Sequence, residues 1–179
     1  MKTQDAPTVR QRILDTAARL FYQQGYPLTG INQLIAEAGV AKASLYQHFR
    51  TKDDILHAYL QQVSQQWFQQ VGEAMAQGHS PKEKVLAVFD MLKEFLVAVN
   101  FRGCNFQNAV VQLAPEEQAI RTFIQAHKAR MGQVFADLLA DESLAEEITL
   151  LFEGALISSQ IRGDGTPVAT ARRLVERLL

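Results

Sequence analysis

Residues 29–52 read TGINQLIAEAGVAKASLYQHFRTK, and they carry the clearest structural signals of the N-terminal part of the chain. Apolar residues recur at helical spacing before Gly39 and resume the same period after it. Gly39 lies where a helix C-cap requires a positive φ, which only glycine adopts without steric cost. The short connection predicts a helix-turn-helix, in which the second helix is free to lie in the major groove of DNA.

The second helix of this pair carries a polar outer face. With Leu45 and Phe49 turned inward, the residues between 42 and 48 remain mainly outside. Lysine and hydroxyl side chains suit phosphate, small residues permit close approach of the backbone, and the amide of Gln47 suits a base edge. The pattern alone leaves open an ordinary αα-hairpin with a solvated polar face. The predicted DNA-binding residues are Thr29, Asn32, Lys42, Ala43, Ser44, Tyr46, Gln47, His48 and Lys52.

The run AGVAKASLYQHFRTKDDIL at residues 38–56 resembles the TetR family of one-component transcriptional regulators. The resemblance extends over residues 9–56 and implies a repressor that binds a palindromic DNA operator as a homodimer and is released by a small molecule. Gly30 departs from the family, which commonly has Ser or Thr there, so Thr29 is expected to act as N-cap. The motif positions are Gly39, Val40, Leu45, Tyr46, His48, Phe49, Lys52 and Leu56.

The composition favours an all-α protein. The 179 residues are 47% hydrophobic and include only five prolines and ten glycines. We expect about nine helices, divided into a three-helix helix-turn-helix DNA-binding domain at residues 1–50 and a helical ligand-binding and dimerisation domain at residues 51–179. Residues 1–7 are expected to form an arm in which Lys2 is the only cation.

The net charge and the cysteine content exclude several classes of protein. The net charge of −1 argues against a protein that coats DNA, although the basic residues lean slightly toward the N-terminal third. A single cysteine excludes an intramolecular disulfide and makes a cysteine-based metal site implausible. No apolar stretch is long enough to span a membrane and no secretory signal is visible, so the expected location is cytoplasmic.

The second half of the chain reads as a helical bundle. Thr51 should cap a helix that continues to about Gln77 and connects the two domains. Lys52 does not suit the positive end of that helix, so a phosphate contact explains it better. Capping boxes are expected where Ser80 precedes Glu83 and where Ser143 precedes Glu146. The last two helices, to about residue 162 and from 166 onward, are apolar on more than one side, which predicts both a bundle and a dimer surface.

Aromatic, methionine and polar side chains of this second domain predict a cavity for a small apolar or electrophilic effector. Each of them taken singly is more often a core residue, because packed interiors need Phe and Met. The predicted ligand-binding residues are Trp67, Phe95, Phe101, Cys104, Gln107, Phe123, His127 and Met131.

Cys104 has two interpretations. The segment Arg102-Gly103-Cys104 opens a short helix, where the dipole favours a thiolate, and it resembles a subset of TetR-type regulators with a Gly-Cys at this point. Some members of that subset sense electrophiles, whereas a free cysteine is usually a buried, inert wall residue. His127 is likewise more typical of a satisfied buried histidine than of a ligand donor.

No motif of an enzyme is present. The sequence contains no nucleophile elbow, no Gly-rich phosphate loop and no cluster at metal-ligand spacing, so we expect no catalysis, no cofactor and no metal. The alternatives to a ligand-responsive repressor are an all-α protein-interaction module without DNA binding and a helical enzyme that uses Cys104. Salt-dependent binding to a palindromic DNA would separate the first from both others.

Overall fold

The computed structural model describes residues 6–179, so most of the arm predicted at residues 1–7, including Lys2, lies outside the described residues. Within the described range the chain forms helices and no strands, which confirms the all-α prediction. The helices are α1 (Val9–Gln23), α2 (Ile31–Ala38), α3 (Lys42–His48), α4 (Lys52–Met75), α5 (Pro81–Ala98), α6 (Asn105–Val110), α7 (Gln118–Leu138), α8 (Glu142–Arg162) and α9 (Thr166–Leu178).

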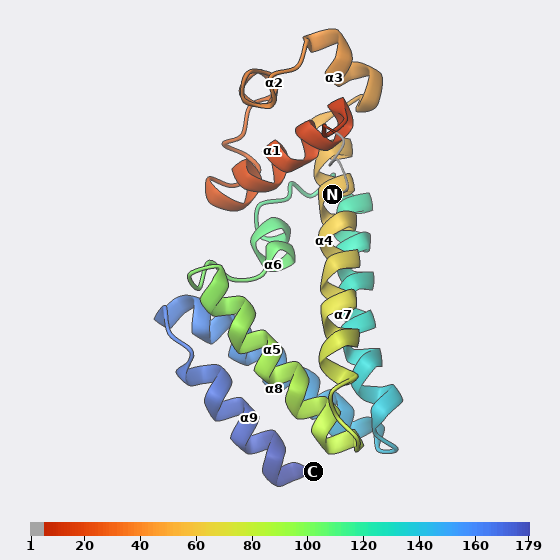
Figure 1. The fold of residues 1–179 in the computed structure, drawn as a ribbon, viewed down its shortest axis with the longest axis vertical. Helices are drawn as coiled ribbons and strands as arrows, with labels where there is room; N and C mark the ends of the chain where they lie inside the picture. The colour runs from red at the N-terminus through yellow and green to blue at the C-terminus, as the bar shows by residue number, and fades with distance from the viewer. Residues whose placement is uncertain (1–5) are drawn as a thin grey trace.

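Helices α1 to α3 form a small head at one end of the molecule (Figure 1). The side chain of Thr8 accepts a hydrogen bond from the backbone of Gln11 and so caps α1. Ile13, Leu34 and Leu45, one from each helix, are completely buried together. The apolar period of the sequence therefore builds the core that holds the second helix of the pair in place.

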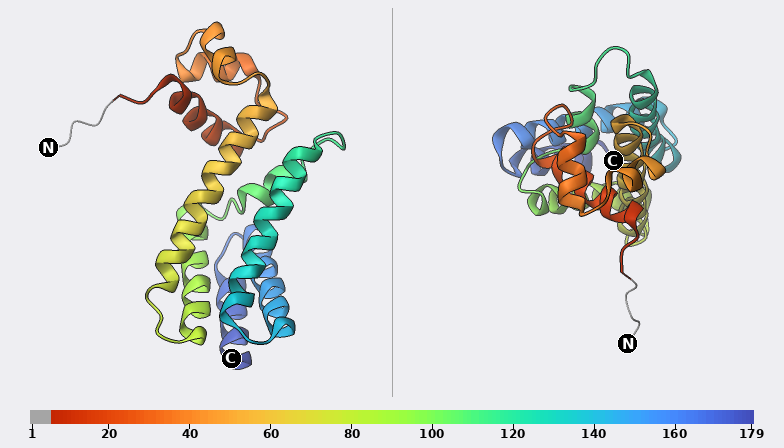
Figure 2. Two further views of the ribbon diagram at one scale, coloured as in Figure 1. Left: turned by 90° about the vertical axis from the view of Figure 1, so that its right-hand side faces the viewer. Right: turned by 90° about the horizontal axis from the view of Figure 1, so that it is seen from above.

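Helix α4 connects the head to the rest of the protein. Thr51 and Asp54 form a capping box at its start, and the helix then continues for 24 residues, a length of about 36 Å. It leaves the head and runs down the second domain (Figures 1 and 2), where it packs against α5 and also contacts α7. The same helix therefore carries side chains of both domains.

The core of the second domain is aromatic. Phe89, Phe135 and Phe152 are at most 1% exposed, and their ring centroids lie 5.5 to 6.2 Å apart. Helices α8 and α9 pack against each other and against α5. The capping box of Ser80 and Glu83 forms as predicted at the start of α5.

The predicted start of α8 is wrong. Asp141, not Ser143, is the N-cap, and its carboxylate accepts a hydrogen bond of 3.1 Å from the backbone of Leu144. The helix therefore begins at Glu142, with Ser143 inside its first turn. Asp is as good an N-cap as Ser, so the helix begins earlier than predicted.

Among residues 6–179, no helix is both long and apolar enough to cross a membrane.

Candidate DNA-binding surface and effector pocket

The turn between α2 and α3 has the geometry that the sequence predicts. Gly39 adopts φ 62° and ψ 42°, and its N–H bonds to the carbonyl of Ala36. The N–H of Val40 reaches back to the carbonyl of Ile35 at 3.2 Å. The guanidinium of Arg12 donates to the Gly39 carbonyl at 3.0 Å, so α1 also fixes the end of α2. The turn is thus held by backbone and side-chain bonds together.

Helix α3 presents most of the predicted contact residues to solvent. Its inward side is marked by Leu45, which is completely buried, and by Phe49 directly after it. Tyr46 is 43% exposed, so its large ring is not used to cover the apolar core of the head. The exposed predicted residues are Asn32, Lys42, Ala43, Tyr46, Gln47 and His48, and Ser44 is half-buried.

Thr29 lies inside the head and does not cap α2. Its side chain is 0% exposed, and its hydroxyl donates to the carbonyl of Gly25 at 2.8 Å. Gly30 occupies the N-cap position of α2, without a side-chain cap. The N-cap prediction for Thr29 was therefore wrong, because the hydroxyl is committed to the preceding loop, and a direct contact of this side chain with DNA is sterically blocked.

Lys52 has partners inside the protein. Its ammonium donates to the carbonyls of Tyr26 and Thr29 at 3.0 and 3.2 Å, and it lies 4.1 Å from the centroid of the Tyr26 ring. The Tyr26 hydroxyl in turn donates to the Asp53 carboxylate. These bonds tie the loop before α2 to the first turn of α4, which gives Lys52 a structural role besides any contact with phosphate.

Sequence reasoning missed Arg50 as a candidate contact. Its side chain is exposed directly after α3, at the edge of the same surface. The basic residue next to Phe49 in the run HFRTK was the available signal. Arg19, by contrast, is engaged in an ion pair with Glu37 on the side of the head.

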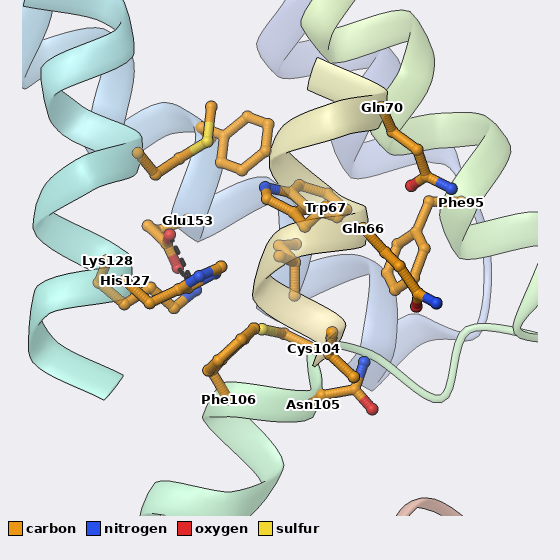
Figure 3. Close-up of a pocket in the computed structure, with 14 residues that line it drawn as sticks. Gln66, Trp67, Gln70, Phe95, Cys104, Asn105, Phe106, His127, Lys128 and Glu153 are labelled. Carbon is orange, nitrogen blue, oxygen red and sulfur yellow. Dashed lines mark hydrogen bonds and ion pairs between the residues drawn. The ribbon is translucent and has the colours of Figure 1, made fainter. Parts of the chain in front are cut away.

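A cavity of about 170 Å³ lies in the second domain and is lined by residues of helices α4 to α8. Figure 3 shows Trp67 near its centre, with Gln66, Gln70 and Phe95 on one side and Lys128 and Glu153 on the other. The lining residues are Val63, Gln66, Trp67, Gln70, Phe95, Cys104, Asn105, Phe106, His127, Lys128, Met131, Phe152, Glu153 and Leu156.

The structure brings five of the eight predicted ligand-binding residues together in this cavity, namely Trp67, Phe95, Cys104, His127 and Met131. Three do not line it. Phe101 lies in the loop before α6 with a positive φ of 55°, and Gln107 donates a hydrogen bond to Glu153 without lining the cavity itself. The Phe123 ring packs on His57, with centroids 5.1 Å apart. Periodicity alone could not show this, because it does not fix the rotation of each helix.

Two charged residues of the wall were missed. The ammonium of Lys128 in α7 lies 2.7 and 2.9 Å from the two carboxylate oxygens of Glu153 in α8. Burial opposes the charge on Lys128, but the neighbouring Cys104 and Glu153 outweigh it and raise the pKa of that ammonium. The Gln107 amide donates a further bond of 2.9 Å to Glu153. Both oxygens of Glu153 therefore have hydrogen-bond partners within the protein.

His127 is neutral at physiological pH. Burial, helped by Lys128 and Arg130, lowers its pKa to about 3. Its Nδ1 lies 2.9 Å from the Ser64 hydroxyl, and its ring stacks on Phe106 with centroids 3.5 Å apart. Among the described residues, no group of three potential ligands could hold a metal ion.

The segment 102–105, which leads into α6, connects the wall of the cavity to the head. Burial raises the pKa of Tyr22 to about 12, and its protonated hydroxyl donates to the carbonyl of Gly103 at 2.7 Å. The guanidinium of Arg102 donates to the carbonyl of Tyr22 at 3.1 Å. The Tyr59 hydroxyl of α4 donates to Asn105, which lines the cavity. Sequence reasoning found none of these contacts, which join residues far apart in the chain.

A helix-turn-helix head with an exposed polar helix, joined to a helical domain around a cavity, defines a one-component regulator of transcription. Comparison with known proteins supports the same class of protein. Residues 13–59 match the model for bacterial regulatory proteins of the tetR family. The uncharacterized HTH-type transcriptional regulator YxaF of Bacillus subtilis is 28% identical over 172 residues, which are 89% of this chain and 88% of YxaF.

Two further proteins resemble the chain over nearly its whole length. The HTH-type transcriptional regulator LmrA of Bacillus subtilis is 26% identical over 180 residues, covering 95% of this chain and 96% of LmrA. The crystal structure of SCO4454, a TetR-family transcriptional regulator from Streptomyces coelicolor, superposes with a TM-score of 0.84 at 29% identity, covering 96% of this chain and 90% of SCO4454. Residues 13–59 therefore form a DNA-binding head of the tetR type, and the chain, which resembles such regulators over nearly its whole length, is a transcriptional regulator and not an enzyme.

Proposed function

We propose that the protein is a cytoplasmic repressor that binds a palindromic operator as a homodimer and leaves it when a small molecule enters the cavity. The observation that carries this proposal is that one helix, α4, begins directly after the recognition helix α3 and lines the cavity with Val63, Gln66, Trp67 and Gln70. We place the boundary between the DNA-binding and ligand-binding domains at residues 50 and 51, where this helix is capped.

The proposed DNA contacts are the exposed residues of α3 together with Asn32 and Arg50. Tyr46 and Ser44 would bond to phosphate, Lys42 would pair with phosphate, and Gln47 would read a base edge. Lys52 is retained as a residue that positions the head, because its ammonium is engaged by two carbonyls.

DNA binding can be tested with a palindrome from upstream of the protein's own or a neighbouring gene, by fluorescence anisotropy over a range of salt. Lys42→Ala should weaken binding and reduce the salt slope by about one unit. Lys93→Ala, which removes another exposed lysine, from α5, is the matched control and should change neither the affinity nor the salt slope. Equal behaviour of the two variants would contradict the assigned surface.

The dimer surface is proposed on α8 and α9. Three apolar side chains of α8, at positions 150, 157 and 161, are 67%, 40% and 78% exposed. Leu174 and Leu178 of α9 are 38% and 47% exposed beside them. So much exposed apolar surface on adjacent helices is typical of an interface between two copies. Ile157→Glu should give monomers in analytical ultracentrifugation, whereas Val111→Glu, on an exposed apolar residue at the end of α6 and outside α8 and α9, should remain dimeric.

Release by the effector would use two routes between the cavity and the head. The first is a tilt of α4, whose first turn is bonded to the loop before α2. The second is the turn Gly103–Asn105, which touches both the cavity and Tyr22 of α1. The effector must bind the released form more tightly, and DNA must then weaken effector binding by the same factor.

An electrophilic effector is the second mode that the cavity supports, because Cys104 lines it beside Lys128. The thiolate sulfur of Cys104 would add to the β-carbon of an unsaturated carbonyl compound, the C=C bond would open, and the α-carbon would take up a proton. Cys104→Ser separates the modes. A variant that still responds to every effector excludes sensing by this thiol and leaves reversible binding.

A further inference from the structure

The charges in the cavity wall cancel. Apart from the neutral His127 and the thiol of Cys104, Lys128 and Glu153 are the only acidic or basic side chains among the lining residues. Both oxygens of Glu153 accept bonds from Lys128, and one also accepts from Gln107 at 2.9 Å. The two side chains are only 25% and 26% exposed, so water replaces these bonds poorly.

An ionic molecule that enters this cavity must compete with the pair. An anion would have to take Lys128 away from Glu153, and a cation would have to take Glu153 away from Lys128. In either case one charge of the wall is left without its partner in a poorly hydrated site. A neutral molecule leaves the pair intact and replaces only water.

The rest of the wall suits a flat apolar body. The Trp67 ring lies 5.2 Å from Phe95 and 6.4 Å from Phe152, edge on in both cases. An apolar cavity of about 150 Å³ is known to hold a benzene molecule, so about 170 Å³ accommodates one substituted ring or a compact bicycle. Asn105 and Gln66 supply amide groups at the edge of this space for a hydroxyl or carbonyl group.

We propose that the effectors are compact, uncharged aromatic molecules with a hydroxyl or carbonyl group, and that the Lys128–Glu153 pair excludes anions and cations alike. The inference rests on the proposed function of this cavity as the effector site. The proposal gives Lys128 and Glu153 a role in selecting effectors by charge, in addition to connecting α7 to α8.

The full-length protein carries its own probe, because Trp67 is the only tryptophan of the chain and lines the cavity. Trp67 fluorescence can be titrated at neutral pH with benzyl alcohol, benzoate and benzylammonium, which share one ring and differ in charge. Benzyl alcohol should bind the wild-type protein roughly tenfold or more tightly than either ion.

Variants of the Lys128–Glu153 pair should change which of the three probes binds most tightly. Lys128→Met leaves Glu153 unpaired, so benzylammonium should become the preferred probe, and Glu153→Gln leaves Lys128 unpaired, so benzoate should. Arg172→Met and Asp90→Asn are the matched controls, because they break an ion pair of 2.7 Å outside the cavity and change the net charge identically. Both controls should keep the wild-type order.

The double variant Lys128→Met/Glu153→Gln guards against a folding defect of either single variant. Its wall is neutral again, so benzyl alcohol should again bind most tightly. Equal binding of the three probes by the wild type, or an unchanged order in whichever single variant folds, overturns the proposal. Because fluorescence needs no DNA, failure of operator binding with a correct order of probes would count against the repressor and not against the charge selectivity.

Discussion

Replacing Gly39 by alanine tests whether the turn between α2 and α3 depends on backbone conformation alone. Gly39 has φ 62° and ψ 42°, in the left-handed region. A Cβ atom built there would meet only a guanidinium nitrogen of Arg12, at 3.6 Å, which is an ordinary contact. The substitution therefore adds no clash, and any loss of stability comes from the backbone.

The magnitude follows from two opposing terms. An alanine in the left-handed region costs about 1–2 kcal/mol. The unfolded chain becomes stiffer when glycine is replaced, which returns about 0.4–1 kcal/mol. The net loss in the free energy of unfolding is about 1 kcal/mol, or roughly 2–4 °C in Tm for a chain of this length.

Urea denaturation at one fixed protein concentration, followed by circular dichroism, measures this loss. Gly163→Ala is the matched comparison, because Gly163 also ends a helix at positive φ, 72°, with no atom within 4 Å of a new Cβ. It should lose the same amount. Gly30→Ala, at φ −84° and equally uncrowded, should stay within about 0.5 kcal/mol of wild type. Equal stability of the variants at positions 30 and 39 would refute the reasoning.

Three further predictions concern the cavity and its connection to the head. Tyr22→Phe removes the hydroxyl that bonds to the Gly103 carbonyl and keeps the ring, so the effect of effector on operator affinity should fall by roughly fivefold, measured by anisotropy with and without effector. Phe152→Ala should lower the free energy of unfolding by about 3–5 kcal/mol, measured by urea denaturation, because the side chain is 1% exposed. The enlarged cavity should also bind two-ring aromatic molecules more tightly than the wild-type cavity does, as measured by quenching of Trp67 fluorescence. His127 has a pKa of about 3 in the folded protein and about 6.5 when unfolded, so the unfolded chain binds the extra proton and stability falls as the pH is lowered from about 6.5 toward 3. His127→Gln should flatten that part of the stability profile relative to wild type.

The head could be predicted from the sequence because its signals are local. The turn requires one glycine at a defined offset, and the cap of Thr51 requires Asp54 three residues later. These interactions lie within a few residues of each other, so the sequence alone specifies them. Where two local signals competed, as for Thr29 and Gly30, the prediction failed, because the hydroxyl of Thr29 found a carbonyl in the preceding loop.

The cavity could be predicted only in part, because its geometry depends on contacts between distant helices. Lys128 and Glu153 meet only through the packing of α7 against α8. Within its own helix, each of the two is a single charged residue in an amphipathic sequence, and such a residue usually lies on the solvent-exposed face. The orientation of α6 depends on the preceding loop, in which Asn100 and Phe101 have positive φ. Non-glycine residues seldom adopt this conformation, so the sequence did not predict it.

The position of Lys52 shows how a tertiary contact can change the meaning of a local anomaly. A cation in the first turn of α4 disagrees with the helix dipole, and the sequence offered phosphate as the explanation. In the structure the ammonium bonds to the carbonyls of Tyr26 and Thr29, while the Tyr26 hydroxyl bonds to Asp53. The loop before α2 is thereby fastened to the start of α4 at three points. A tilt of α4 would then carry the head with it as one body, so a displacement at Trp67 reaches α3 without any rearrangement inside the head.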